Sequence, residues 1–380
     1  MSKVKTSGIS KILLITCGTI FALLSGELLL RAFDVDLRLL QRTLYYQSMY
    51  PKLHKASPDA QRLYELIPNS AEKVQATHVA EPDYKKLDIA VNELGFRGKS
   101  HPRLKRKGIF RIVVFGGSNT FGPTVGDDDT YPAQMEKILD ERFPGKVEVW
   151  NAGICAYQMS QDVAYAESVI KEFDPDLLVL QDTNQGRRAF FCNTTFKELK
   201  ELFGKNKELF AENIPPLWRQ DVLPSGRALL LLVSAGGKIH HVLVSASVLY
   251  RSFCVGLYSC VGTFSYNSPT FPIASRFSYF WGFNGQQVSD RRLDLFIRQH
   301  QEKKIIMFFM PDVFQINPDA VKAKDNAGVF VLNVKGKPSE YQDPHPPSYV
   351  YAWYARELCD FLTQKGYLPV DSLSPKKPGP

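Results

Sequence analysis

Short apolar segments alternate with amphipathic ones along much of the chain. Five segments have the length and apolar character of buried strands, and they lie at 112–115, 147–150, 176–180, 305–310 and 329–334. Apolar residues recur at helical spacing in four others, at 133–143, 158–172, 289–301 and 349–365. Continuous apolar runs are typical of strands covered on both faces. The alternation therefore predicts an α/β fold, with a parallel, doubly wound sheet between two layers of helices.

Residues 12–30 form a longer apolar run, which is interrupted by Ser25 and Glu27 and closed by Arg31. The run can nearly span a bilayer, which needs about 20 apolar residues. A cleaved signal peptide is the alternative, but the run is long for one and no clear small-residue cleavage site follows it. We therefore expect an uncleaved transmembrane helix. Because lysines precede the run, its amino-terminal end should stay in the cytoplasm and residues 32–380 should be exported.

The pattern divides the chain into four parts. We expect a cytoplasmic tip and transmembrane anchor at 1–31, a membrane-proximal arm of short helices at 32–107, and a flexible tail at 371–380. The α/β domain then covers residues 108–370. It carries an insertion at 193–288, where the alternation of strands and helices stops.

The insertion contains a second long apolar run, residues 242–264. Its length alone allows a membrane span, but Arg251 lies in its middle, where a charge is costly. A second crossing would also place the first strand and the last helix of the α/β domain on opposite sides of the membrane. We therefore expect the insertion to be partly a buried helix and partly a wall or lid over the site, which can dip into the membrane surface.

Composition narrows the possible functions. The 380 residues are 44% hydrophobic and 23% charged, enough for one large core, with a formal net charge of +8. The basic run at 103–107 can attract anionic headgroups or an acidic glycan, although a solvated loop is the commoner outcome. We find no nucleic-acid motif and no Gly-rich phosphate loop. The acidic run Asp127–Asp129 lacks partner ligands at a recognisable spacing, so we expect no metal and assign these residues to capping and solvation.

The six cysteines are scattered without metal-ligand spacing. Cys254 and Cys260 are the only locally plausible disulfide pair, and buried free thiols are an equally good interpretation.

Candidate chemistry begins with Ser118, which follows the first apolar strand after two glycines. Gly116 and Gly117 allow a sharp turn, so the hydroxyl would lie just beyond the carboxyl end of the strand, where open α/β sheets bind ligands. A serine there is suited to be a nucleophile. The alternative is an ordinary strand-to-helix loop in which Ser118 caps the next helix.

Other groups needed for serine chemistry occur at the ends of later strands and before the last helix. His345 is suited to be the general base, and Asp343 can fix its tautomer. The backbone N–H groups of Ser118 and Gly153 and the side-chain amide of Asn184 are candidate donors of an oxyanion hole. For Asp343 and His345, the alternative is a surface Asp-Pro turn with an incidental histidine. For Asn184, the alternative is an ordinary turn residue.

These four blocks resemble the SGNH (GDSL-type) hydrolase family, and they occur in the order and on the elements expected of it. The resemblance rests on Ser118, Gly153, Asn184 and His345 and spans roughly residues 92–192 and 289–365, and the amino-terminal anchor looks like that of membrane-anchored bacterial members. Gly replaces the usual Asp before the serine, Gln185 replaces the usual Asp after Asn184, and only one residue separates Asp343 from His345. The resemblance implies a flavodoxin-like three-layer α/β/α sandwich, no cofactor, and ester hydrolysis through an acyl-serine intermediate.

The sequence therefore predicts an exported serine esterase, anchored in the cytoplasmic membrane by residues 12–30, which removes acyl groups, acetyl in particular, from an envelope glycan or a lipid. An acetyltransferase that passes the same acyl group to a sugar is the first alternative. A non-catalytic scaffold or binding protein is the second.

Overall fold

The structure, a computed structural model, describes residues 8–43, 52–75, 86–182, 195–206, 239, 242–256, 285–309, 321, 326–332, 338 and 345–369. The chain divides into two compact units. The anchor unit consists of Met1–Tyr45 and Thr195–Asn284, and the sheet unit of Tyr46–Thr194 and Gly285–Pro380. Asn184, Asp343 and the tail at 371–380 lie outside the described residues.

The sheet unit is built on a five-stranded parallel sheet with the strand order β6-β5-β7-β8-β9. The strands are β5 (Phe110–Gly116), β6 (Val147–Gly153), β7 (Leu177–Gln181), β8 (Lys304–Phe309) and β9 (Ala327–Val331). Counted by their appearance in the chain, they lie in the order 2-1-3-4-5, which is that of flavodoxin-like folds. The predicted flavodoxin-like parallel sheet is confirmed.

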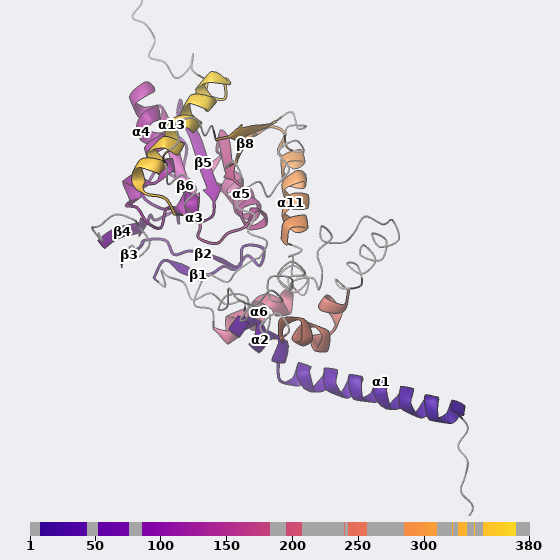
Figure 1. Cartoon of the computed structure of the whole chain (residues 1–380). Coiled ribbons are helices and arrows are strands. Elements are labelled where there is room, and N and C mark those ends of the chain that lie inside the picture. The colour runs from indigo at the N-terminus through magenta and orange to yellow at the C-terminus, as the bar shows by residue number, and fades with distance from the viewer. Residues whose placement is uncertain are drawn as a thin grey trace, which may run out of the picture. The chain divides into compact units, whose positions relative to one another are not determined.

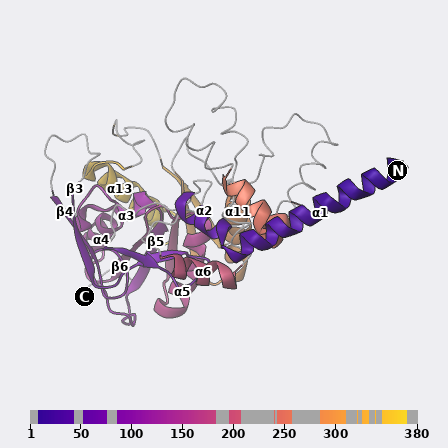
Figure 2. The same cartoon turned by 90° about the horizontal axis from the view of Figure 1, so that it is seen from below.

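Helices cover both faces of this sheet and complete three layers (Figures 1 and 2). On one face, α4 (Tyr131–Arg142) packs against α13 (Ser348–Gln364), and both share a core with Ile112 and Phe308 of the sheet. On the other face, α5 (Met159–Phe173) packs against α11 (Gly285–Gln299). Because successive strand residues point to opposite faces, the continuous apolar strands supply both cores.

Most elements begin and end close to where the pattern placed them. The cap of α4 is Thr130, which follows the acidic run, since its Oγ1 accepts a hydrogen bond from the Ala133 N–H at 3.4 Å. The clearest shift concerns β6, which continues to Gly153, so that the residues expected to follow this strand form its last part.

The expectation of short helices at 32–107 is wrong for most of this segment. Among its described residues only α2 (Val35–Thr43) is an α-helix, and two antiparallel strand pairs follow it. These pairs are β1 (His54–Ala56) with β2 (Tyr64–Leu66) and β3 (Ser70–Gln75) with β4 (Lys86–Val91). Strands β1 and β2 have three residues each, too few for an alternating pattern, whereas β4 does alternate, with Leu87, Ile89 and Val91 two residues apart, and this signal was missed.

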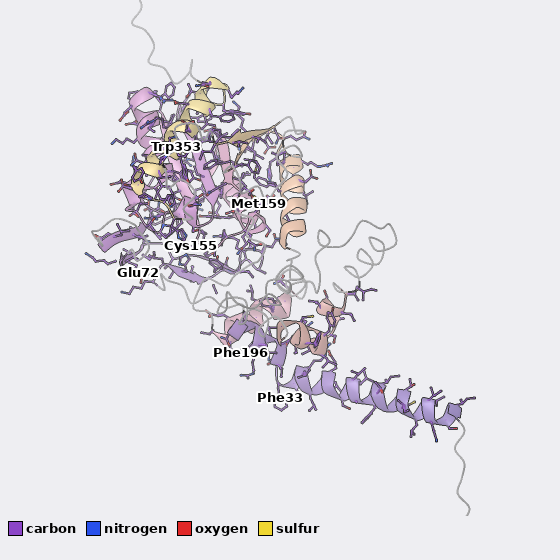
Figure 3. All side chains as sticks on the ribbon, in the orientation of Figure 1. Phe33, Glu72, Cys155, Met159, Phe196 and Trp353 are labelled. Carbon is purple, nitrogen blue, oxygen red and sulfur yellow. The ribbon has the colours of Figure 1, made fainter. Side chains whose placement is uncertain are left out.

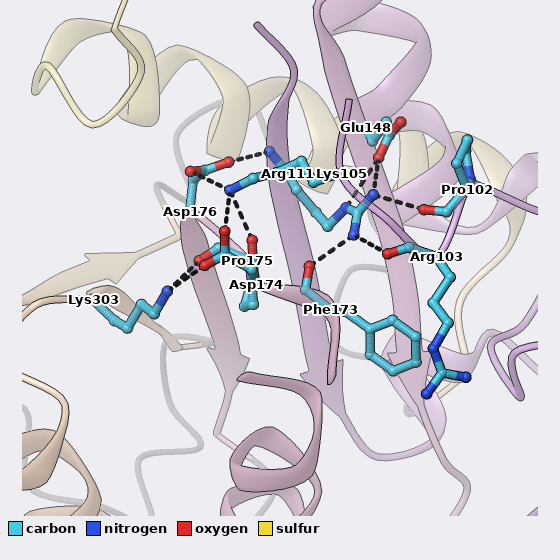
Figure 4. Close-up of polar contacts among 10 residues, drawn as sticks. All are labelled: Pro102, Arg103, Lys105, Arg111, Glu148, Phe173, Asp174, Pro175, Asp176 and Lys303. Carbon is cyan, nitrogen blue, oxygen red and sulfur yellow. Dashed lines mark hydrogen bonds and ion pairs between the residues drawn. The ribbon is translucent and has the colours of Figure 1, made fainter. Parts of the chain in front are cut away.

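The basic run at 103–107 lies at the amino end of the sheet, where acidic side chains pair with it (Figure 4). Lys105 contacts Asp174 and Asp176, and Arg103 contacts Glu172. Beside them Arg111 is fully buried in β5. Its guanidinium donates to the Glu148 carboxylate and to the carbonyl oxygens of Pro102, Arg103 and Phe173. Much of the positive charge is thus compensated within the protein.

In the anchor unit, α1 (Gly8–Ala32) is long and apolar enough to cross a membrane, and none of its residues is buried. The second apolar run is divided at Ser247 into helical residues 242–246 and 248–256. Arg251, which lies within it, is buried and donates to Asp36 Oδ2 at 2.6 Å. This ion pair accounts for the charge in the middle of the apolar run. The unit also contains α2 and α6 (Phe196–Lys205).

Cys254 is a buried free thiol. The disulfide with Cys260 that the spacing allowed is therefore not formed.

Candidate active site

Ser118 is the first residue of α3 (Ser118–Phe121), a single helical turn that follows β5 directly. Gly117 occupies the cap position of this turn, and no side chain caps it. The interpretation of Ser118 as a helix cap is therefore wrong. Among the described residues no hydrogen bond involves the Ser118 hydroxyl, and the side chain is only half-buried. Its hydroxyl thus lies at the carboxyl end of an inner strand, as the sequence predicted.

The end of β6 lies directly against α3 because Gly153 has no side chain. A Cβ atom at Gly153 would collide with the backbone of Thr120 and Phe121. Gly116, at the end of β5, has a similar role, since a Cβ atom there would collide with Thr120 Oγ1. The two glycines therefore allow the serine turn to pack onto the edge formed by β5 and β6.

Asn151 of β6 connects the same two elements through its side-chain amide. Its Nδ2 donates to the Thr120 carbonyl oxygen at 2.9 Å, and its Oδ1 accepts from the Gly153 N–H at 2.9 Å. The Gly153 N–H thus already has an acceptor in this structure. For the oxyanion role predicted from the sequence, this N–H would have to share its hydrogen between two acceptors or exchange one for the other. That role stays a prediction.

A buried hydroxyl network holds α3 from its other side. Thr120 Oγ1 donates to Gln181 Oε1 of β7 at 2.7 Å and lies 2.8 Å from the Tyr131 hydroxyl oxygen of α4. Because Thr120 gives its proton to Gln181, Tyr131 is the donor to Thr120. Burial raises the pKa of Tyr131 well above its usual value, so its hydroxyl remains protonated and can donate. The serine turn is thereby fixed to the sheet and to α4.

Arg97 fixes the loop that follows α3. Its side chain is fully buried, and its guanidinium donates to the carbonyl oxygens of Phe121, Gly122 and Val125. Its Nε donates to Asp127 Oδ1 at 3.0 Å. Burial raises the pKa of Asp127, although the charge of Arg97 opposes this effect. One planar guanidinium thus satisfies three carbonyl groups of the loop between the serine turn and α4.

His345 lies three residues before α13, on the segment that packs against this same loop. Thr124 Oγ1 lies 3.2 Å from the Pro346 carbonyl oxygen and 3.5 Å from that of His345. The structure therefore brings the backbone of the histidine segment to the loop that follows Ser118. The partners of the sequence-predicted triad and oxyanion hole, Asp343 and Asn184, lie outside the described residues.

Cys155 is the other potential nucleophile near the end of β6. It is buried, and burial raises the pKa of its thiol to about 12 (Figure 3). A thiol with this pKa is protonated at neutral pH and is a poor nucleophile. Within the described ranges, no group of His, Cys, Asp and Glu side chains is arranged to hold a metal ion.

Sequence reasoning missed Arg97, Asn151, Thr120 and Gln181, all of which hold the serine turn from buried positions. Only their polarity within or beside apolar runs signalled them, since a buried polar side chain requires partners. The pattern alone could not show which partners those would be.

No family model matches this chain, and no curated protein matches its sequence. Among solved structures, it has some likeness to the psychrotrophic esterase EstA of Pseudoalteromonas sp., with 6% identity and a TM-score of 0.35, over 68% of this chain and 99% of that one. A carbohydrate esterase family 2 enzyme with a carbohydrate-binding domain from Myceliophthora fergusii has 8% identity and a TM-score of 0.33, over 72% of this chain and 70% of that one.

Proposed function

We propose that this chain is a serine esterase of the SGNH (GDSL-type) class, which removes acyl groups, acetyl in particular, from an envelope glycan or a lipid. The observation that supports the proposal best is the position of Ser118. It begins α3 at the carboxyl end of β5, its hydroxyl does not cap the helix, and the His345 segment is bonded to the loop that follows. A nucleophile and a base on these two segments are suited to acyl transfer.

In the proposed reaction, Ser118 Oγ attacks the acyl carbon of the ester while His345 accepts the hydroxyl proton. The N–H groups of Ser118 and Gly153 and the amide of Asn184 stabilise the oxyanion that forms. The bond to the alcohol oxygen then breaks, and His345 returns the proton to the departing alcohol. Water attacks the acyl-serine in the same way, which releases the carboxylic acid and restores the serine. Asp343 holds the tautomer of His345 throughout.

A retained membrane anchor is the second part of the proposal, with α1 crossing the cytoplasmic membrane once and the remainder on its periplasmic or extracellular side. Glu27 of α1 supports retention over cleavage. Its carboxylate accepts hydrogen bonds from the Ser247 hydroxyl at 2.9 Å and from the N–H groups of Val248 and Leu249 at 2.9 and 2.8 Å. Cleavage after α1 would remove the acceptor that caps the amino end of residues 248–256.

The catalytic proposal is tested by p-nitrophenol release from the acetyl ester, catalysed by the full chain in detergent. Ser118→Ala should abolish release above background. Ser168→Ala is the matched control, because the Ser168 hydroxyl only donates to the Tyr165 carbonyl oxygen within α5, and it should keep the rate. Equal rates in wild type and Ser118→Ala would exclude Ser118 as the nucleophile.

The same assay with oligosaccharide acceptors separates hydrolysis from transfer. Release that does not depend on the acceptor supports the esterase. Release that rises with acceptor, together with acetylated sugar, supports a transferase. If there is no turnover and Ser118 is not labelled by a fluorophosphonate, the chain is a binding protein that retains the fold.

The anchor is tested by the intact mass of the protein extracted from membranes. A retained anchor predicts a mass that includes residues 1–31 and resistance of the protein to alkaline carbonate extraction. A mass that lacks this segment would show that it is a signal peptide.

A further inference from the structure

An exposed apolar helix face in the anchor unit has no role in the proposed reaction. Ile239, Val242, Leu243 and Ala246 are spaced i, i+3, i+4 and i+7, as on one face of a helix, and all four are exposed. Ile239 is 59% exposed and Val242 is 62% exposed. Val244, which does not belong to this face, is fully buried. Single exposed apolar residues are common, but Val242, Leu243 and Ala246 lie together on one face of the helical residues 242–246, and Ile239 has the spacing to extend that face, which is a pattern typical of an interaction surface.

Two side chains of α1 attach this helical segment to the end of the anchor. Arg31 Nη2 donates to the Ala246 carbonyl oxygen at 2.6 Å, directly at the end of the apolar face. Glu27 caps the next helical segment through Ser247, and Glu27 and Arg31 also pair with each other at 2.6 Å. Residues 242–256 are thus held at the last turn of α1 by charge-assisted hydrogen bonds (Figure 1).

The place of this attachment along α1 determines what the face meets. Arg31 is the charged residue that ends the apolar run, and α1 ends at Ala32. If α1 crosses the bilayer, this turn lies at the membrane surface, because a rise of about 1.5 Å per residue places Glu27 within one turn of the end of the span. Phe33, which follows α1, is 65% exposed at the same level (Figure 3).

We infer that the face formed by Ile239, Val242, Leu243 and Ala246 is a second membrane contact, which lies in the boundary between headgroups and acyl chains beside the anchor. This inference rests on the proposed membrane span of α1. The lipid surface is the occupant that the structure favours, because the face is hydrogen-bonded to the last turn of α1, a helix that exposes large apolar side chains from Ile9 to Leu29. Helices that carry an apolar face bind in this boundary region when they lie parallel to the membrane. The contact would fix how residues 242–256 are oriented about the axis of α1.

Photo-crosslinking in phospholipid vesicles tests the inference with the full chain. Val242 is replaced by p-benzoylphenylalanine, the reconstituted protein is irradiated, and its intact mass is measured after the free lipid is removed. We expect a mass increase of one phospholipid. The same photo-crosslinking residue in place of Leu23 in α1 tests whether α1 spans the membrane. In place of Lys197, an exposed polar residue of α6 in the same unit, it measures background crosslinking to lipid.

The outcomes separate this inference from the proposed anchor. Lipid adducts at positions 23 and 242 but not at 197 support the second contact. Adducts at 23 alone overturn it and leave the anchor intact, and a protein–protein adduct at 242 overturns it in favour of a second copy or another protein. No adduct at 23 contradicts the span, and the inference falls with it.

Glu27→Ala in the Val242 variant tests the attachment. The lipid adduct at 242 should decrease several-fold while that at 23 is unchanged, because the helical segment loses the carboxylate that caps it. An unchanged adduct at 242 would show that Glu27 does not hold the face at the membrane.

Discussion

Ser118 has the same neighbours in sequence whether it caps a helix or begins one. The two interpretations differ by one position, and the backbone of Gly117 decides between them. Gly117 takes the cap position with φ of -81° and ψ of -144°, so Ser118 enters the helix and its hydroxyl has no capping role. The sequence therefore predicted the position of the serine at the end of the strand. Whether its hydroxyl caps the helix depends on backbone dihedral angles, which the two adjacent glycines leave undetermined.

Asn184 is expected to contribute to the rate more than to stability. Asn184→Ala should lower kcat by roughly 10²–10³, since the proposed contact with the oxyanion forms only in the transition state. Urea unfolding should change little.

Asn326→Ala is the contrasting control for this prediction. The Asn326 amide donates to the carbonyl oxygens of Ile297 and His300, so its loss should reduce the free energy of unfolding by about 1–2 kcal/mol and leave kcat near that of the wild type. If kcat of Asn184→Ala equals that of the wild type, Asn184 does not belong to the oxyanion hole.

At the scale of elements, the loop between α3 and α4 depends on a side chain from outside it. Arg97 comes from the segment after β4, and its backbone N–H donates to the Asn151 carbonyl oxygen of β6 at 3.1 Å. Its guanidinium then reaches three carbonyl groups of the loop. The sequence places Arg97 just after Gly95-Phe96, where it could equally have been a solvated arginine. Only the packing of three separate segments buries it.

Arg97→Lys should impair both the loop and the reaction. A lysine keeps the charge but is a single point donor without the planar fork, so it leaves some of the loop carbonyl groups unsatisfied. We expect a loss of about 2–4 kcal/mol in the free energy of unfolding. We also expect slower fluorophosphonate labelling of Ser118 under conditions where the variant is folded.

Arg142→Lys is the matched control for this substitution, because Arg142 pairs with Asp360 at the surface. It should change the free energy of unfolding by less than about 1 kcal/mol. Equal effects of the two variants would contradict the assigned role of Arg97.

The Glu136 carboxylate attaches the segment before β5 to α4, and its contribution should depend on pH. It accepts from His101 Nε2 at 3.0 Å and from the Val149 N–H at 3.0 Å. Burial alone would raise the pKa of Glu136, but these hydrogen bonds and the nearby positive charge bring it below its usual value.

Because the folded-state pKa is lowered, the stabilisation is present above the unfolded pKa of Glu and is lost as the pH falls through the folded value. Glu136→Gln should therefore cost about 1–2 kcal/mol at pH 7, and the difference from the wild type should shrink below about pH 4. Urea midpoints at the two pH values measure it. A difference that is constant with pH would show that the charge of Glu136 is not involved.

At the scale of the whole molecule, the parallel sheet and its helices followed from the alternation of apolar segments. The antiparallel strands β1 to β4 did not, because β1 and β2 are only three residues long and β3 has few apolar residues, while the alternation in β4 was missed. The sequence pattern also did not predict the division into two units. The sequence places α1 and residues 195–284 far apart, and the contacts that unite them, such as Arg251 with Asp36 and Glu27 with Ser247, are specific pairs that no periodicity reveals.

Replacement of residues 195–284 by a short Gly/Ser linker should leave the sheet unit folded, because every described residue of the core around α4 and α13 belongs to that unit. The deletion removes Trp218 and Trp281, so Trp150 and Trp353 alone report on the remaining protein. Both are buried. We expect blue-shifted emission and a cooperative urea transition, whereas red-shifted emission without a transition would show that the units do not fold separately.

The position of β7 inside the sheet sets a condition on synthesis of the protein. One edge of β7 pairs with β5 and the other with β8, where Leu177 lies opposite Lys304. More than 100 residues must therefore be synthesised after β7 before β8 can pair with its second edge. At about 5–20 residues per second, the edge stays open for about 6–25 s. An apolar strand with an unpaired edge is prone to aggregate during that interval. Slow, late completion of the sheet would make the nascent chain a client of chaperones, and the export proposed above would then favour passage across the membrane before the chain folds.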